Sequence, residues 1–113
     1  MKRGEIYLAN LNPSRGSEQA GIRPVILVQR NSLERFTRMA IVVPLTSNCR
    51  RAQVPGTLEI PAGEGGLTQN SVALCYQMVV LNQERVGRKL GELSELYLKL
   101  LGKAIAYTLE LEC

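Results

Sequence analysis

Hydrophobic and polar positions along this chain follow the pattern of short β-strands over most of its length. The apolar stretches are rich in Val, Ile and Leu and are bounded by Pro, Gly or Asn, which is typical of strands separated by turns. The longest of them, residues 71–81, is closed by Asn82. The pattern therefore predicts five strands, over residues 5–11, 24–29, 39–46, 57–60 and 71–81.

The end of the chain changes to a helical period. Ser94 precedes the change and is a good N-cap, and Glu95 suits the positive end of a helix dipole. Apolar residues then recur at intervals of three and four, as on one face of an α-helix: Leu98, Leu101, Ile105 and Leu109. We therefore predict one C-terminal helix, preceded by a mixed connector over residues 86–93.

The predicted order of elements indicates a mainly β fold with a C-terminal helix. Five short strands suit a small, strongly bent sheet or partly open barrel, with the helix covering one face or an opening. The length of 113 residues is that of one domain, residues 1–113. Because so small a sheet leaves edges to cover, we also expect a homodimer.

Composition and charge narrow the function only slightly. The formal net charge is +4, and ten of the fourteen basic residues are Arg, whose planar fork pairs with phosphate oxygens. This is a hint of a nucleic-acid partner, although many proteins with such a charge bind none. The chain has four Tyr and one Phe, too few for a surface built mainly from base-stacking platforms.

The location of the protein is predicted from what the chain lacks. No apolar run approaches the roughly 20 residues needed to span a bilayer, and the first residues do not resemble a signal segment. The three Cys are odd in number and widely spaced, which favours reduced thiols. We expect a soluble cytoplasmic protein.

Several kinds of chemistry are disfavoured by the residue types present. The chain has no His, which removes the usual acid and base of metal-independent ribonucleases and the commonest zinc ligand. Its cysteines, Cys49, Cys75 and Cys113, have no ligand spacing and are interpreted as core or surface thiols. Since no phosphate-cradling glycine motif occurs either, we expect no metal and no cofactor.

Polar residues instead gather at the predicted mouths of strands. The loop over residues 12–22 is too long for a tight hairpin, and such loops are often functional. Arg23 follows this loop directly before Pro24, so it should be extended at the start of the second strand. Thr46, Ser47 and Asn48 end the third strand.

These residues resemble a known family. The chain carries GEIY at 4–7, GSEQAGIRPV at 16–25 and VPLTS at 43–47, followed by Ser71-Val72 and Gln77-Met78. In order and over the whole chain, these stretches are similar to those of the MazF/PemK toxins.

The resemblance implies a barrel like an SH3 fold (the MazF/CcdB type), a homodimer, and sequence-specific cleavage of single-stranded RNA without a metal. Such a messenger RNA interferase uses the ribose 2′-hydroxyl as nucleophile and leaves a cyclic phosphate and a 5′-hydroxyl. An antitoxin normally neutralises it, and the toxin's positive charge favours an acidic, partly disordered partner. The family's catalytic Arg and Thr correspond to Arg23 and Thr46.

Two roles stay open from the residues alone. Glu18 is either the general base or a solvated loop carboxylate, because arginine stays protonated and is a poor base. RNA selection is expected from the first loop, the loop after the third strand, and the family's Gln: Ser17, Gln19, Ser47, Asn48, Arg50, Arg51 and Gln77. Arg50 and Arg51 are alternatively solvated charges, and Val79 and Asn82 depart from the family pattern.

Two other functions compete with RNA cleavage. A non-catalytic toxin of the same fold that poisons DNA gyrase, as CcdB does, cannot be separated by fold alone. Such proteins use a C-terminal Trp, and this chain has no Trp. An inactive module that binds RNA or protein is the second alternative, although Arg23 and Thr46 are both present.

Overall fold

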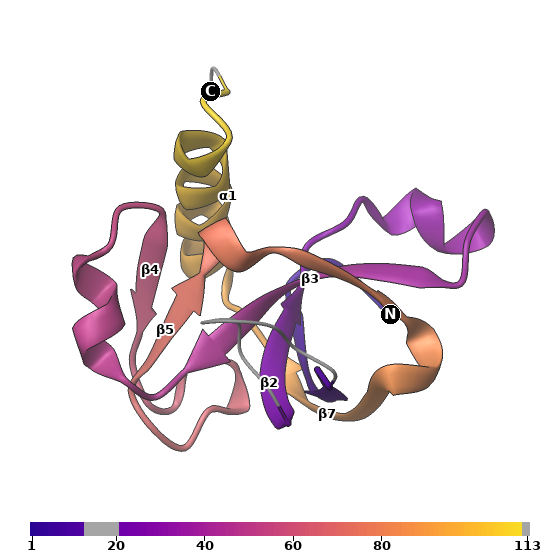
Figure 1. Ribbon diagram of the computed structural model, residues 1–113, viewed down its shortest axis with the longest axis horizontal. Helices are drawn as coiled ribbons and strands as arrows, with labels where there is room; N and C mark the ends of the chain where they lie inside the picture. The colour runs from indigo at the N-terminus through magenta and orange to yellow at the C-terminus, as the bar shows by residue number, and fades with distance from the viewer. Residues whose placement is uncertain (13–20, 112–113) are drawn as a thin grey trace.

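The computed structural model describes residues 1–12 and 21–111. In these ranges the chain forms an antiparallel sheet of seven strands and one α-helix (Figure 1). The strands are β1 (Glu5–Asn10), β2 (Ile22–Leu27), β3 (Met39–Thr46), β4 (Thr57–Ile60), β5 (Ser71–Leu74), β6 (Val79–Asn82) and β7 (Val86–Glu92). The helix is α1 (Glu95–Thr108), and the 3-10 turns are η1 (Asn31–Arg35), η2 (Cys49–Gln53), η3 (Glu64–Gly66), η4 (Cys75–Gln77) and η5 (Gln83–Arg85). The mainly β fold with a C-terminal helix is confirmed.

β3 is the long strand around which the sheet bends. The strands are ordered β4-β5-β3-β2-β1-β7, and β6 also pairs with β3. β6 pairs with the first half of β3, where Val42 lies opposite Val79, and β5 pairs with its end, where Leu45 lies opposite Ala73. The two halves diverge, so β4 and β5 lie apart from β2 and β7 in Figure 1. A strongly bent sheet results.

The prediction of a single strand over residues 71–81 is wrong in one respect. The segment forms two strands, β5 and β6, which are separated by η4. Three steps along β3, from Val42 to Leu45, span the same distance as six steps along the chain from Ala73 to Val79. The three extra residues, Cys75–Gln77, are accommodated in the turn. Apolar residues continue on both sides of it, so their pattern could not reveal the break.

β7 was predicted only as a connector. It pairs antiparallel with β1, with register shifts between Ile6 and Tyr7 and between Tyr7 and Ala9. The strand was missed because its two glycines and its charged residues weaken a β pattern. Two residues of this strand, Arg88 and Leu90, line the cleft of the candidate site.

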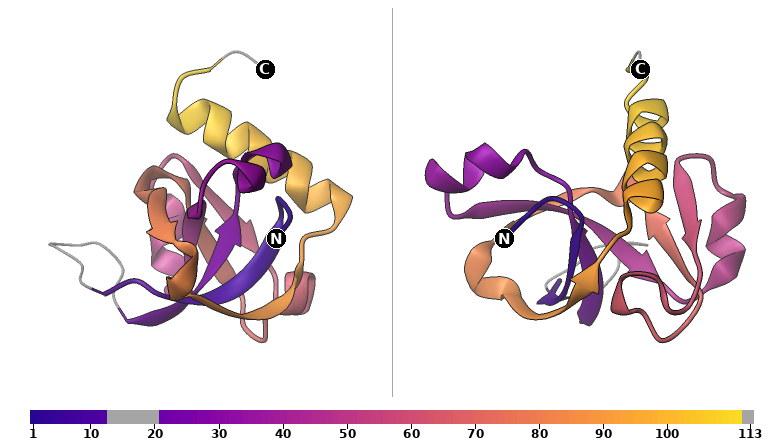
Figure 2. Two further views of the ribbon diagram at one scale, coloured as in Figure 1. Left: turned by 90° about the vertical axis from the view of Figure 1, so that its right-hand side faces the viewer. Right: turned by 180° about the vertical axis from the view of Figure 1, so that it is seen from behind.

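The C-terminal helix covers the bent sheet and closes the core (Figure 2). Ser94 caps it by accepting a hydrogen bond from the Tyr97 N–H at 3.5 Å, as predicted. Leu101 is fully buried in the core, against which Leu98 and Ile105 pack. Leu109, predicted on the same face, lies past the helix end and is exposed. Within the described ranges, no helix is long and apolar enough to cross a membrane.

Candidate active site

A cleft of about 390 Å³ opens beside the ends of β2 and β3. It extends across the sheet to β7 and is bordered on another side by the segment that follows η3. The lining residues are Leu8, Ile22, Arg23, Pro24, Leu45, Thr46, Ser47, Gly66, Leu67, Thr68, Gln69, Ser71, Arg88 and Leu90. Three of the residues predicted for the site, Arg23, Thr46 and Ser47, are therefore brought together.

Arg23 lies within β2 rather than before it. It is placed opposite Ala9 of β1, and Pro24 follows it opposite Leu8. The ring of Pro24 keeps the preceding residue extended, so Arg23 enters the cleft from a fixed strand. Its side chain is exposed at the mouth, where an anionic group can reach it.

Thr46 is the last residue of β3 and is only 9% exposed. Its Oγ1 accepts a hydrogen bond from the Asn48 N–H at 3.2 Å. The same hydroxyl still has its proton to donate, because hydrogen bonding as an acceptor uses only a lone pair. The backbone thus holds the Thr46 hydroxyl in place, and Thr46 lines the same cleft as Arg23.

A second polar group forms beyond Thr46, outside the lining of the cleft. Arg51 in η2 donates from Nη2 to the Tyr76 hydroxyl at 2.7 Å, and Gln77 in η4 donates from Nε2 to the same hydroxyl at 3.3 Å. Within the described part of the chain, the buried Oε1 of Gln77 has no hydrogen-bond partner. Arg51 and Gln77, both predicted to bind RNA, are thus joined through Tyr76, which the sequence reasoning did not single out.

The remaining predicted residues lie in different places. Asn48 caps η2, because its Oδ1 accepts a hydrogen bond from the Arg50 N–H at 3.3 Å. Arg50 lies in η2 and is exposed. Three residues of the first loop fall outside the described residues: Ser17, Glu18 and Gln19.

The two departures from the family pattern have structural roles here. Val79 begins β6 opposite Val42 of β3. Asn82 caps η5, because its Oδ1 accepts a hydrogen bond from the Glu84 N–H at 2.9 Å. Val79 therefore packs against the core, and Asn82 shapes the turn between β6 and β7.

The electrostatic character of the cleft is positive. Arg23 and Arg88 are the only charged residues among the described ones that line it. Arg88 was not predicted, because the segment that holds it was not recognised as a strand. No three potential metal-ligating residues gather anywhere in the described part of the chain. The cleft is suited to an anion with uncharged polar neighbours.

The two described cysteines differ in environment. Cys75 is buried in the core, and burial raises the pKa of its thiol to about 11. It is therefore an unreactive core thiol, as expected. Cys49 is exposed, and its Sγ lies 3.7 Å from the Ser47 carbonyl oxygen. Cys113 lies outside the described residues.

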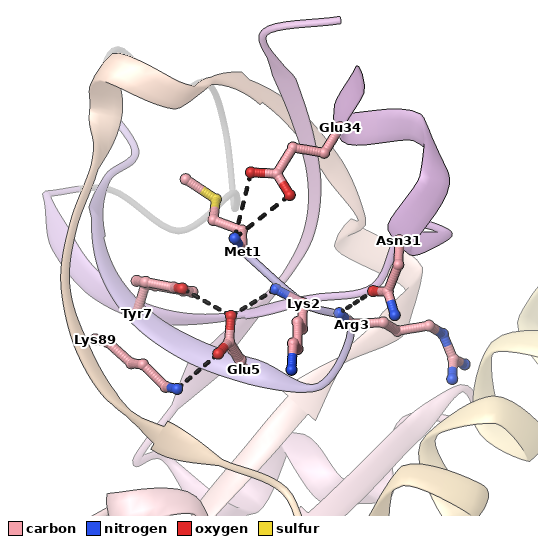
Figure 3. A network of polar contacts seen from close by, with 8 residues as sticks. All are labelled: Met1, Lys2, Arg3, Glu5, Tyr7, Asn31, Glu34 and Lys89. Atoms are coloured by element: carbon pink, nitrogen blue, oxygen red, sulfur yellow. Dashed lines mark hydrogen bonds and ion pairs between the residues drawn. The ribbon is translucent and has the colours of Figure 1, made fainter. Parts of the chain in front are cut away.

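A buried carboxylate on the other face of β1 fixes β7 in place (Figure 3). Glu5 is 7% exposed and accepts hydrogen bonds from the Tyr7 hydroxyl at 2.8 Å, the Lys2 N–H and the Lys89 ammonium at 2.6 Å. Burial alone would raise the pKa of Glu5, but these bonds, led by that from Lys89, outweigh it and lower the pKa to about 2. Burial and the bond to Glu5 raise the pKa of Tyr7 to about 12.

Comparison with known proteins links this geometry to a family. A sequence profile of PemK-like, MazF-like toxins of type II toxin–antitoxin systems matches residues 2–109. The chain is 37% identical over 111 residues to "Endoribonuclease MazF" of Staphylococcus saprophyticus, which covers 98% of this chain and 92% of that protein. It is 34% identical over 111 residues to "Endoribonuclease EndoA" of Bacillus subtilis, covering 98% and 96%.

The fold is also similar to that of solved structures. An endoribonuclease from a mycobacterial species, solved in complex with its cognate antitoxin, superposes with a TM-score of 0.81. The alignment covers 100% of this chain and 98% of that one, at 23% sequence identity. At that identity the likeness concerns the fold.

Proposed function

We propose a function from one premise: the chain belongs to the family of PemK-like, MazF-like toxins of type II toxin–antitoxin systems. The chain is an endoribonuclease that cuts single-stranded messenger RNA at short sequences without a metal ion. The observation that carries the proposal is the cleft in which Arg23 and Thr46 meet from adjacent strands. Two relatives that match nearly the whole chain are named endoribonucleases.

The reaction follows from the charges that develop at a phosphodiester. Attack by the ribose 2′-hydroxyl on the phosphorus places additional negative charge on the phosphorane oxygens. The guanidinium of Arg23 and the hydroxyl of Thr46 stabilise that charge, and loss of one such donor costs roughly 2.7–4 kcal/mol in the transition state. The bond to the 5′-oxygen of the next nucleotide then breaks, and that oxygen takes a proton from water, leaving a 2′,3′-cyclic phosphate and a 5′-hydroxyl.

The proton of the 2′-hydroxyl needs an acceptor. Arginine stays protonated and is a poor base, and the described residues that line the cleft include no carboxylate. We assign the general base to Glu18. This choice rests on its place in the loop that leads to Arg23.

RNA is selected by two groups of residues. Ser47 lines the cleft itself, and the first loop adds Ser17 and Gln19. The other group lies around η2 and η4: Asn48, Arg50, Arg51 and Gln77. The second group is supported by the hydrogen bonds that join Arg51 and Gln77 through the hydroxyl of the exposed Tyr76.

The proposed partners follow from the same premise. The toxin acts as a homodimer of one domain, residues 1–113, and is neutralised by an acidic, partly disordered antitoxin. A protein of similar fold has been solved with its cognate antitoxin. Since messenger RNA is the substrate, the cytoplasm is the place of action.

The test uses purified full-length protein and a long single-stranded transcript in EDTA, with the 5′ ends of the products mapped. Discrete cuts by the wild type and a loss of about 10²–10³ in rate for Arg23→Ala are expected. Arg38→Ala is the matched control, because it makes the same change and Arg38 does not line the cleft. Intact RNA with correctly folded wild-type protein would overturn the proposal and favour an inactive binding module.

The base is tested by Glu18→Gln under single-turnover conditions. The pH dependence of the wild-type rate should show an acidic limb that this variant lacks, because the amide cannot titrate. Unchanged rates and pH dependence in Glu18→Gln would exclude the carboxylate as the base.

A further inference from the structure

Arg88 is a second cation in the cleft, contributed by a strand other than those of Arg23 and Thr46. It belongs to β7, whereas Arg23 belongs to β2 and Thr46 to β3. Within the described part of the chain, the guanidinium of Arg88 makes no hydrogen bond or ion pair. Arg88 is exposed, and the described residues that line the cleft with it include no carboxylate, so its guanidinium is available to a bound anion.

The direction of Arg88 is set by the strand that carries it. Successive side chains of a strand point to opposite faces, and Lys89 turns to the face where it meets the Glu5 carboxylate (Figure 3). Its neighbours Arg88 and Leu90 both line the cleft on the opposite face, as does Leu8 of β1. The pair between Lys89 and Glu5 therefore keeps Arg88 turned toward the cleft.

A bulge reinforces this placement. Tyr7 lies opposite Lys89 and Ala9 opposite Val86, so β7 has one residue more than β1 between these two pairs. Gly87 and Arg88 together lie opposite the single residue Leu8 of β1. A bulge of this kind changes the direction of a side chain on the bulged strand. Gly87 also has the Leu8 carbonyl oxygen 3.2 Å from the position that a Cβ would occupy.

The spacing of the strands indicates which phosphate Arg88 can reach. β1 lies between β2 and β7, so the backbones at Arg23 and Arg88 are two strand spacings, or roughly 10 Å, apart. If Arg23 and Thr46 hold the phosphate that is cleaved, the guanidinium of Arg88 is placed for a different phosphate of the same strand. Arginine is suited to it, because its fork makes two-point contacts with phosphate oxygens.

We propose that Arg88 binds the RNA phosphate next to the one that is cleaved, and so positions the strand across the cleft. This inference rests on the proposed function, and it adds a residue that the sequence resemblance does not assign. It predicts an effect on binding rather than on the chemical step, because a neighbouring phosphate gains no charge in the reaction.

The binding test uses wild type, Arg88→Gln, Arg88→Lys and Arg38→Gln with a random-sequence 2′-O-methyl RNA oligonucleotide, which cannot be cleaved. Arg38→Gln removes the same charge, and Arg38 lies at the other end of β3 from Thr46, roughly 26 Å away by strand rise. The slope of log affinity against log salt should fall by about 0.7 in Arg88→Gln, as for one lost phosphate contact on a single strand. Arg88→Lys should keep most of the slope.

The kinetic test uses an RNA oligonucleotide that carries a mapped cut. Arg88→Gln should raise KM by about tenfold and change kcat by less than about twofold, while Arg38→Gln matches the wild type in both. Equal slopes and KM values for the two Gln variants would overturn the proposal, as would a fall in kcat at unchanged KM. If the wild type cleaves no RNA, the proposed function fails, and the salt slopes alone decide whether Arg88 contacts RNA.

Discussion

Replacing Glu5 by Gln removes the charge that holds β1 and β7 together, while keeping the size of the side chain. The amide can still accept the hydrogen bonds from Tyr7 and the Lys2 N–H, but it cannot form the ion pair with Lys89. Because β7 carries Arg88 into the cleft, the variant tests both the stability of the fold and the support of the cleft.

The magnitude follows from the pKa of the carboxyl group. Its pKa is lowered from 4.5 to about 2 in the folded protein, so the fold favours the charged form. At about 1.4 kcal/mol for each pKa unit, the difference of about 2.5 units corresponds to about 3.5 kcal/mol. Since the Lys89 side chain is 45% exposed, solvent screens its share of the interaction, and we expect about 2 kcal/mol.

The sign of the pH dependence is fixed by the same shift. A lowered carboxyl pKa stabilises the fold fully above pH 4.5, and that stabilisation is lost as the pH falls from 4.5 towards about 2. The free energy of unfolding of the wild type should therefore exceed that of Glu5→Gln at pH 7. The difference in unfolding free energy between wild type and Glu5→Gln should fall by more than about half between pH 7 and pH 3.

The assay is urea denaturation of wild type, Glu5→Gln and Glu59→Gln between pH 3 and pH 7. Glu59 is exposed in β4 and serves as the control, expected to stay within about 0.5 kcal/mol of the wild type. A constant difference in unfolding free energy between wild type and Glu5→Gln over the whole pH range would show instead that the Glu5 pKa is not depressed.

Three further predictions concern the cleft and the core. Thr46→Val should reduce RNA cleavage by about 10²-fold or more and Thr46→Ser should retain most of it, in single-turnover assays, because only the hydroxyl is needed. Gly66→Ala should destabilise the fold by more than Gly63→Ala in thermal unfolding, since both have positive φ but only at Gly66 would a Cβ meet the backbone of β7. Leu101→Ala should cost about 2–5 kcal/mol in urea denaturation, because its side chain is fully buried. Equal cleavage rates of Thr46→Val and Thr46→Ser would contradict the first prediction, and equal unfolding temperatures of Gly66→Ala and Gly63→Ala the second. A loss of less than about 1 kcal/mol in the unfolding free energy of Leu101→Ala would contradict the third.

Features of the fold that depend on local pattern could be predicted from the sequence. The C-terminal helix was predicted because its period and its Ser94 cap are local signals. Arg23 and Thr46 were predicted to share a site through a resemblance, and both line one cleft.

Features that depend on pairing between distant segments could not be read from the chain. The division of residues 71–81 depends on how β5 and β6 share β3, which no local period records. β7 is held as a strand by its contacts with β1, 80 or so residues away, although its own residues favour a strand only weakly. Arg88 was missed for that reason, and Tyr76 was missed because its hydrogen bonds to Arg51 and Gln77 cross between two turns.

In the proposed reaction, the RNA's own 2′-hydroxyl attacks the phosphate held by Arg23 and Thr46. The most direct measurement compares two oligonucleotides that contain a mapped cut, one all RNA and one with a single 2′-deoxy nucleotide immediately 5′ of the cleaved phosphate. In EDTA, the wild type should cut the first, leave the second intact and yield a 5′-hydroxyl. Cleavage of both at equal rates would contradict it.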